Sequence, residues 1–265
     1  MPDESELESE SAEAAAAHPA PLGLRRRSIY LLPNLFTTGV LFCGFFAIVQ
    51  AMNERFEIAA IAIYVAMVLD GMDGRVARWT HTASEFGAQY DSIADMVAFG
   101  AAPALVAYEW ALRDLGTAGW IAAFVYCAAA GIRLARFNVN IGVVDKRYFQ
   151  GLPSPSGAAV MTGLVWMLDG FDLVPEEHVW IAGVTWLVAV FAGLTMVSNL
   201  PFYSFKEFNW RRRVPLWVIL AAVIAYSVVA TRPPLILFLL FFSYSLSGYV
   251  MWARGGRVKS VLPEE

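Results

Sequence analysis

Four aspartates in one short segment are the residues of this chain best suited to do chemistry. Asp70 and Asp73 are three positions apart and Asp91 and Asp95 are four apart, so each pair shares one face of a helix. All four lie within or beside strongly apolar stretches. An aspartate in mid-membrane costs roughly 3 kcal/mol, so four together need compensation. Bound cations would supply it, and oxygen-only ligation favours Mg²⁺ or Mn²⁺.

Small residues accompany the carboxylates. Gly74 and Ala77 share the face of the first pair, and Ser84, Gly87 and Ala88 share the face of the second. Because small side chains allow close approach by a backbone or a ligand, the pattern predicts a narrow acidic cleft between two consecutive helices.

The aspartates allow two other interpretations. Ion pairs with Arg75 and Arg78 could hold a bundle together, but two arginines do not neutralise four carboxylates. Alternatively, a cation transporter could use the aspartates as an ion pathway. That second alternative stays open at the level of the residues.

The elements that position these residues are predicted to be membrane helices. Apolar residues make up 58% of the 265 residues and charged residues 16%, with a mean hydropathy of +0.54. Ordinary soluble domains are about half apolar and a quarter charged. Segments long enough to cross a bilayer occur at eight places: 29–52, 57–79, 86–112, 116–137, 155–172, 178–200, 214–230 and 233–253. We therefore expect an all-α integral membrane protein with about eight transmembrane helices.

Basic residues predict the orientation of these helices. With both termini in the cytoplasm, 16 of the 19 Lys and Arg residues lie on the inner side and three on the outer side, as the positive-inside rule requires. Residues 58–69 place 12 apolar positions before Asp70, roughly 18 Å of helix in a hydrocarbon core roughly 30 Å thick. The cleft is thus expected to open toward the cytoplasm, and the membrane to be a bacterial-type cytoplasmic membrane.

The aspartate segment resembles the signature of the CDP-alcohol phosphatidyltransferases, which in this chain reads D-G-x-D-G-x-x-A-R, followed after eight residues by G-x-x-x-D-x-x-x-D. Every fixed position is filled, by Asp70-Gly71, Asp73-Gly74, Ala77-Arg78, Gly87, Asp91 and Asp95. The resemblance implies a six-helix core at residues 25–210 that usually forms a homodimer. It follows a disordered acidic tail at 1–24 and precedes two additional helices with a short cytoplasmic tail at 211–265.

The resemblance also implies an active site that transfers a phosphatidyl group from CDP-diacylglycerol to an alcohol and releases CMP. Two divalent ions, Mg²⁺ or Mn²⁺, would be held by the first three aspartates, with Asp95 as the catalytic base and a further ligand. Arg78 suits a nucleotide phosphate oxygen. Small residues would leave space for CDP-diacylglycerol: Gly71, Gly74, Ala77, Ser84 and Gly87.

Other stretches are similar to the phosphatidylserine synthase branch of that family. They are PNLFT at 33–37 with FCGF at 42–45, GIRLARFNV at 131–139 and YFQGLPSPSGAA at 148–159. The stretches 91–104 and 196–208 are similar less sharply, since Ala98 stands where serine is expected. The acceptor implied is therefore serine.

Serine carries a carboxylate, which a planar guanidinium binds through two hydrogen bonds. Arg133 and Arg136 are the candidates, and polar contacts are expected from Asn34, Ser92 and Asn138. The arginines could equally be interfacial anchors, and Asn34 a helix cap. Glycerol 3-phosphate, inositol phosphate or choline stay open as other acceptors. The expected partners are both substrates, the lipid bilayer and a second copy of the chain, with no nucleic acid.

Overall fold

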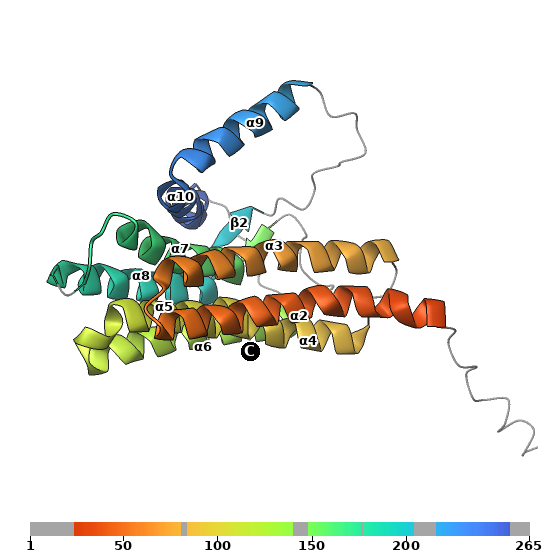
Figure 1. Cartoon of the computed structure of the whole chain (residues 1–265), viewed down its shortest axis with the longest axis horizontal. Helices are drawn as coiled ribbons and strands as arrows, with labels where there is room; N and C mark the ends of the chain where they lie inside the picture. The colour runs from red at the N-terminus through yellow and green to blue at the C-terminus, as the bar shows by residue number, and fades with distance from the viewer. Residues whose placement is uncertain (1–23, 81–83, 140–147, 176, 204–215, 255–265) are drawn as a thin grey trace, which may run out of the picture.

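The computed structural model describes residues 24–80, 84–139, 148–175, 177–203 and 216–254, with element labels as in Figure 1. Helix α2 (Leu24–Met52) and helix α3 (Phe56–Thr80) lie side by side along most of their lengths. The turn between them places Glu54 at φ 60°. This helical pair carries the first two aspartates.

The third predicted segment is not one regular α-helix. It consists of α4 (Glu85–Asp95), a π-helical stretch (Met96–Ala101) and α5 (Ala102–Trp110). A Cβ placed on Gly44 of α2 would lie 2.6 Å from the Cα of Ala98, so the π-helical backbone packs directly on a residue without a side chain. Such π segments often mark functional sites, and this one begins immediately after Asp95.

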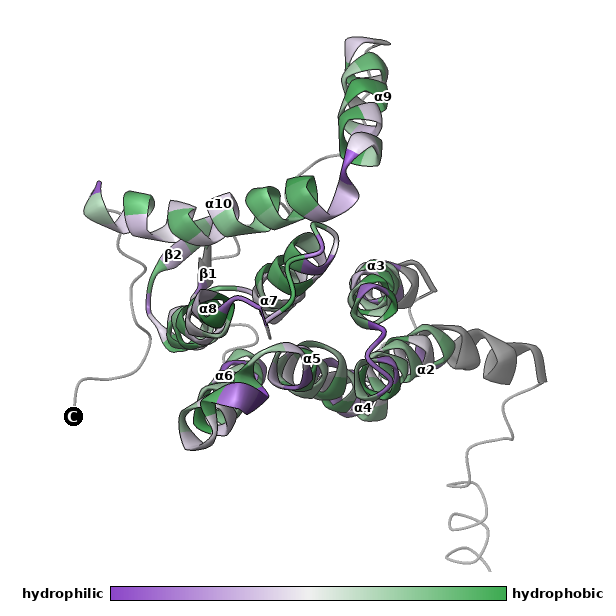
Figure 2. Ribbon diagram, turned by 60° about the vertical axis from the view of Figure 1, so that its left-hand side comes forward, coloured by the Kyte–Doolittle hydropathy of each residue, from purple (hydrophilic) through white to green (hydrophobic). Residues whose placement is uncertain are grey.

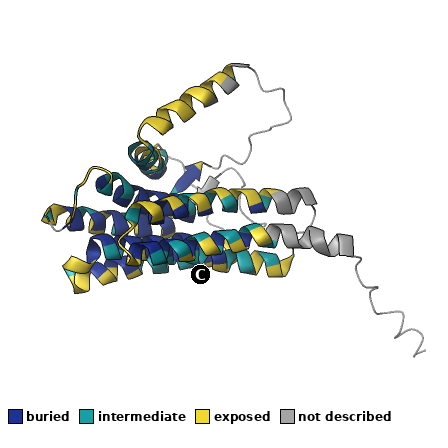
Figure 3. Ribbon diagram, viewed as in Figure 1, coloured by how far each residue is buried: buried dark blue, intermediate teal, exposed yellow. Residues whose placement is uncertain are grey.

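Three further helices complete the core, after a short 3₁₀ turn (Leu112–Leu115). They are α6 (Thr117–Val139), α7 (Ser154–Asp169) and α8 (Val179–Val197). Buried residues concentrate in α5, α7 and α8, whereas α9 is largely exposed (Figure 3). The small residues of α7 allow this close packing, since Gly157, Ala158 and Gly163 are all buried.

A two-stranded antiparallel ribbon, which the sequence did not predict, joins the ends of two core helices. Strand β1 (Tyr148–Gln150) precedes α7, strand β2 (Pro201–Tyr203) follows α8, and Gln150 pairs with Pro201. Strands of three residues are too short to show a period-two hydrophobic pattern. Their pairing therefore depends on the helices that bring them together.

The last two helices differ in how they meet the other helices. Helix α9 (Leu216–Thr231) projects away from the bundle, and α10 (Pro233–Ala253) crosses α7 and β2 (Figure 2). Pro233 and Pro234 occupy the first turn of α10, where the missing N–H costs nothing.

The prediction of an all-α membrane protein with about eight helices is confirmed. Within the described residues, four stretches are long and apolar enough to cross a membrane: Asn34–Met52, Thr117–Val139, Val179–Val197 and Pro233–Ala253. The remaining helices are shorter, interrupted or charged. Helices α7 and α9 have 16 residues each, and α3 carries the first aspartates of the motif.

Candidate active site

Three carboxylates converge between α3 and α4. One oxygen each from Asp70, Asp91 and Asp95 lies within 4.8 Å of the other two, and all three residues are half-buried. The helical spacing of each pair turns these side chains toward the same gap. The predicted acidic cluster between consecutive helices is therefore present in the structure.

Asp73 lies beside this cluster in a more enclosed position. It is 5% exposed and accepts a hydrogen bond of 3.2 Å from the Thr37 hydroxyl of α2. It also accepts the backbone N–H of Gly74, and its carboxyl contacts that of Asp91. Thr37, within the PNLFT stretch, is a site residue that sequence reasoning missed, since nothing in its spacing relates it to a carboxylate 36 positions away.

The cluster has the chemistry of a site for hard divalent cations. Its donors are carboxylate oxygens alone, which suits Mg²⁺ or Mn²⁺ better than zinc or copper. The Oδ1 atom of Asp95 is buried and has no hydrogen-bond partner in the described residues. A buried carboxylate oxygen without a partner is costly, and coordination to a cation would satisfy it. The residues thus fit the metal that the sequence predicts.

Two glycines of the motif differ in the space around them. A Cβ added to Gly71 would meet nothing within 4 Å, so open space adjoins the chain directly after Asp70. A Cβ on Gly87 would meet the Ser84 hydroxyl at 3.1 Å and the Asn34 amide oxygen at 3.5 Å. Ser84 accepts the backbone N–H of Gly87 at 3.0 Å and is the N-cap of α4.

Two members of the motif are not placed in detail. Helix α3 continues through Ala77 and Arg78, but their side chains lie outside the part of the chain that the structure describes. Their predicted contacts with the nucleotide therefore stay predictions. Gly74 is described and is half-buried.

Arg133 of α6 lies near the cluster. Its Nη1 donates to the fully buried Ser154 hydroxyl at the start of α7, at 2.7 Å. The guanidinium interacts electrostatically with Asp95, and its Nε is buried without a hydrogen-bond partner in the described residues. This unused N–H beside the acidic cluster is available to donate a hydrogen bond to an anionic group of a ligand.

Arg136, one turn later on α6, makes a different set of contacts. Its guanidinium donates to the Val197 carbonyl at 3.2 Å and to the side-chain oxygens of Gln150 and Asn199. Gln150 lies in β1, Val197 is the last residue of α8 and Asn199 follows it, so Arg136 connects the end of α6 to β1 and to the end of α8. Gln150 and Asn199 are further residues that sequence reasoning missed, although both lie within the stretches noted above.

Ser92 and Asn138 meet across two helices. The Asn138 amide donates to the Ser92 hydroxyl at 2.9 Å, and that hydroxyl donates to the Ala88 carbonyl at 3.0 Å. The structure therefore brings these two predicted residues together, linking α4 to the end of α6. Asn34 lies next to Gly87 instead, and the Thr38 hydroxyl donates to its carbonyl at 2.7 Å.

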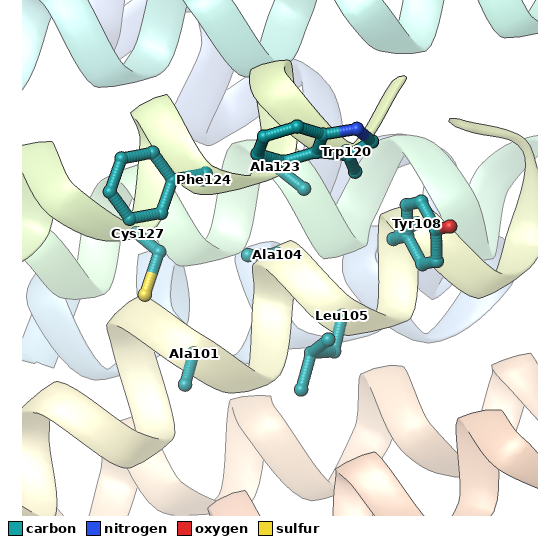
Figure 4. A pocket seen from close by; sticks show the side chains of 8 residues that line it. All are labelled: Ala101, Ala104, Leu105, Tyr108, Trp120, Ala123, Phe124 and Cys127. Atoms are coloured by element: carbon teal, nitrogen blue, oxygen red, sulfur yellow. The ribbon is translucent and has the colours of Figure 1, made fainter. Parts of the chain in front are cut away.

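Two apolar hollows lie away from the four aspartates, and the larger of the two lies against α6. It is an open, apolar hollow of about 440 Å³ between α5 and α6, lined by Leu105, Tyr108, Trp120, Phe124, Cys127 and three alanines (Figure 4). None of the four aspartates lines it. A second apolar hollow of about 280 Å³ follows α3 up to Leu69, the residue before Asp70. Both have the apolar lining expected of surfaces that face lipid, so the acidic cluster is the better candidate for chemistry.

Carboxylates from two consecutive membrane helices define the class of protein. The chain belongs to the CDP-alcohol phosphatidyltransferase family, whose profile matches residues 30–197. This range contains the whole aspartate motif, both arginines and, apart from Asn199, the residues to which they donate hydrogen bonds. It also favours an enzyme over the ion pathway that the aspartates alone left open.

Curated relatives narrow the comparison to one branch of the family. The chain is 35% identical over 224 residues to CDP-diacylglycerol–serine O-phosphatidyltransferase of Helicobacter pylori strain 26695, covering 84% of this chain and 92% of that protein. It is 31% identical over 195 residues to the protein of that name from Methanocaldococcus jannaschii, covering 73% and 83%. The Mycobacterium tuberculosis H37Rv protein of that name is 33% identical over 189 residues, covering 68% and 64%.

Proposed function

We propose that this chain transfers the phosphatidyl group of CDP-diacylglycerol to the hydroxyl of L-serine, giving phosphatidylserine and CMP. The convergence of Asp70, Asp91 and Asp95 within 4.8 Å is the observation that carries the proposal. The names of the curated relatives support serine as the acceptor. No relative supports glycerol 3-phosphate, inositol phosphate or choline among those compared above.

Asp70, Asp73 and Asp91 would hold two divalent ions, Mg²⁺ or Mn²⁺, with Asp95 as a further ligand. When bound, such ions neutralise charge on the pyrophosphate and stabilise the departing CMP. The Thr37 hydroxyl fixes the Asp73 carboxylate in one orientation. Residues of α2, α3 and α4 would thus hold the metal-ligating carboxylates in place before the substrate binds.

Asp95 is positioned to accept the proton of the attacking serine hydroxyl. Its Oδ1 atom is buried and accepts no hydrogen bond in the described residues, which leaves this atom available to a cation or, at the moment of attack, to the proton of the serine hydroxyl. The new bond forms between the serine oxygen and the lipid-side phosphorus, and the bond from that phosphorus to CMP breaks. A positioned general base typically contributes about 10² to 10⁴-fold to the rate of such a step.

Arg133 is the better placed of the two arginines to bind the serine carboxylate. The Nη1 of Arg133 donates to Ser154, whereas its Nε has no hydrogen-bond partner in the described residues. Arg133 also lies near Asp95. Arg136 would not bind serine directly but would hold β1 and the end of α8 in position around it. Asn34, Ser92 and Asn138 would complete the polar lining.

CDP-diacylglycerol would occupy the side of the cluster bordered by the motif glycines. The open space beside Gly71 and the close packing around Gly87 support a nucleotide there, with Arg78 at a phosphate oxygen. Ala77, Gly74 and Ser84 would line the same side. The acyl chains would remain among the lipid-facing helices.

The remaining expectations are part of the proposal. The termini and the active site would face the cytoplasm, and the core at 25–210 would form a homodimer in the bilayer. The charge distribution of the loops supports the orientation, and the family resemblance supports the dimer. Cysteine labelling from either side of sealed vesicles would test the orientation.

The decisive experiment measures CMP release by purified protein from CDP-diacylglycerol with Mg²⁺ or Mn²⁺ and a panel of alcohols. We expect release with serine and loss of release after chelation by EDTA. No release with any alcohol would refute the enzyme. Release with glycerol 3-phosphate but not with serine would keep the family and reject the acceptor.

A further inference from the structure

Helix α10 follows the residues matched by the family profile, yet it contacts the β1–β2 ribbon. That ribbon lies next to Arg136, and α7, which follows it, contacts Arg133. The Tyr244 hydroxyl donates to the Tyr203 carbonyl in β2 at 3.2 Å, and its ring lies 5.6 Å from that of Phe202. Phe202 is fully buried. A Cβ on Gly248 would lie 2.4 Å from the Phe202 ring, so α10 and β2 are in contact without space between them.

A second tyrosine joins α10 to the end of α8. The Tyr249 and Thr195 hydroxyls are 2.7 Å apart, and Thr195 is fully buried. The Thr195 carbonyl accepts the backbone N–H of Leu152 at 3.1 Å, between β1 and α7. Helix α10 therefore contacts both segments that the ribbon connects.

The ribbon leads directly to the two arginines. Gln150 pairs with Pro201 in the ribbon, and its side chain accepts a hydrogen bond from Arg136. Four residues later, Ser154 accepts one from Arg133. A displacement of β2 would therefore move partners of both guanidinium groups.

Among the polar side chains of α10, the serines bond within their own helix and two tyrosines bond to other elements. Ser245 and Ser247 donate to carbonyls of their own helix three residues earlier, at 2.6 Å each. The hydroxyls of Tyr244 and Tyr249, in contrast, reach β2 and α8. Polar groups in a membrane helix are costly unless satisfied. Two tyrosines directed at β2 and at the end of α8 indicate a role beyond membrane anchoring.

We propose that α10 is a positioning element of the acceptor site, with Tyr244 holding β2 so that the ribbon keeps Arg133 and Arg136 in place for the serine carboxylate. This inference rests on the proposed function, because it requires an anionic acceptor near the arginines. It predicts that perturbing α10 affects the acceptor and not CDP-diacylglycerol. Tyr244 is a positioning residue and does not contact the reacting atoms.

Kinetics of Tyr244→Phe test the proposal. The variant keeps the ring and removes one hydrogen bond, so we expect the KM for serine to rise about three- to tenfold, the range that one typical hydrogen bond allows. The KM for CDP-diacylglycerol should stay within about twofold. Tyr226→Phe on α9, where the side chain is 76% exposed, is the matched control and should leave both constants unchanged.

A glycine pair provides a second test. Gly248→Ala places a methyl group against Phe202, whereas Gly183→Ala on α8 places one in open space. Gly248→Ala should raise the KM for serine more than Tyr244→Phe does, and Gly183→Ala should not. Faster hydrogen exchange at residues 148–154 in Gly248→Ala would accompany the change.

The outcomes separate this inference from the proposed function. Failure of the wild-type protein to use serine would reject the proposed acceptor and, with it, this inference. Wild-type activity with serine, together with an unchanged KM for serine in both α10 variants, would overturn the positioning role alone. Equal increases in both KM values would also overturn it, because they indicate a general structural defect.

Discussion

Replacing Asp95 by asparagine separates proton transfer from metal binding at the acidic cluster. Asparagine has nearly the same shape and still offers one oxygen, but it is a very poor base. If Asp95 accepts the serine proton, kcat should fall by about 10² to 10⁴-fold, or about 2.7 to 5.4 kcal/mol of transition-state free energy. The binding of CDP-diacylglycerol should survive.

The geometry also predicts an effect on stability. Two unit charges 4.8 Å apart, the largest separation within the cluster, repel by about 3 kcal/mol at an effective dielectric constant of about 20. Removing the charge of Asp95 relieves its repulsion with both neighbours. Part of that repulsion is already reduced by solvent, since the three residues are half-buried. Without metal, Asp95→Asn should therefore unfold at a higher temperature than the wild type.

Three measurements on detergent-solubilised protein test this reasoning: CMP release, metal titration by calorimetry, and thermal unfolding with Mg²⁺ or EDTA. Asp91→Asn is the matched control, and it should lose metal affinity more strongly than Asp95→Asn. Near-normal turnover of Asp95→Asn would refute its role as base. If Asp95→Asn loses as much metal affinity as Asp91→Asn does, Asp95 is primarily a metal ligand. A lower unfolding temperature in EDTA would refute the electrostatic account.

Three further predictions concern single contacts. Arg133→Lys keeps the positive charge but removes the planar pair of N–H donors, so the KM for serine should rise at least about tenfold while the KM for CDP-diacylglycerol stays unchanged. Steady-state kinetics measures both constants, and equal increases in the two would show that Arg133 only anchors the helix. Thr37→Val removes the donor to Asp73 and should weaken Mg²⁺ binding about threefold to tenfold in calorimetry; unaltered affinity would contradict this. In Gly44→Leu the new side chain would overlap the π-helical backbone, which should lower the free energy of unfolding by about 1–3 kcal/mol or more. Gly183→Leu is the control, because its side chain enters open space. Equal unfolding temperatures of the two variants would contradict this prediction.

Much of the site was predictable because its central pattern is local. The spacings of Asp70 with Asp73 and of Asp91 with Asp95 place each pair on one helical face wherever the helices lie. The small residues around them indicated that the two faces approach closely. The structure confirms an acidic cluster of three members, with Asp73 held beside it by Thr37.

The roles of the two arginines were not predictable from their spacing. Arg133 and Arg136 are three positions apart on one helix and appear equivalent in the sequence. In the structure, one lies beside Asp95 with an unused Nε, and the other donates to three protein oxygens. This difference arises from the packing of α6 against α7 and α8.

The sequence by itself determined the membrane class, the helices within a few residues of their ends, and the cluster of carboxylates, because hydropathy and helical periodicity are properties of neighbouring residues. The tertiary structure alone decided which partners those helices meet. Arg136 bonds to residues 14 and 63 positions away, and Tyr244 to one 41 positions away. Such contacts depend on how helices and a three-residue ribbon pack, and no local pattern in the chain encodes them.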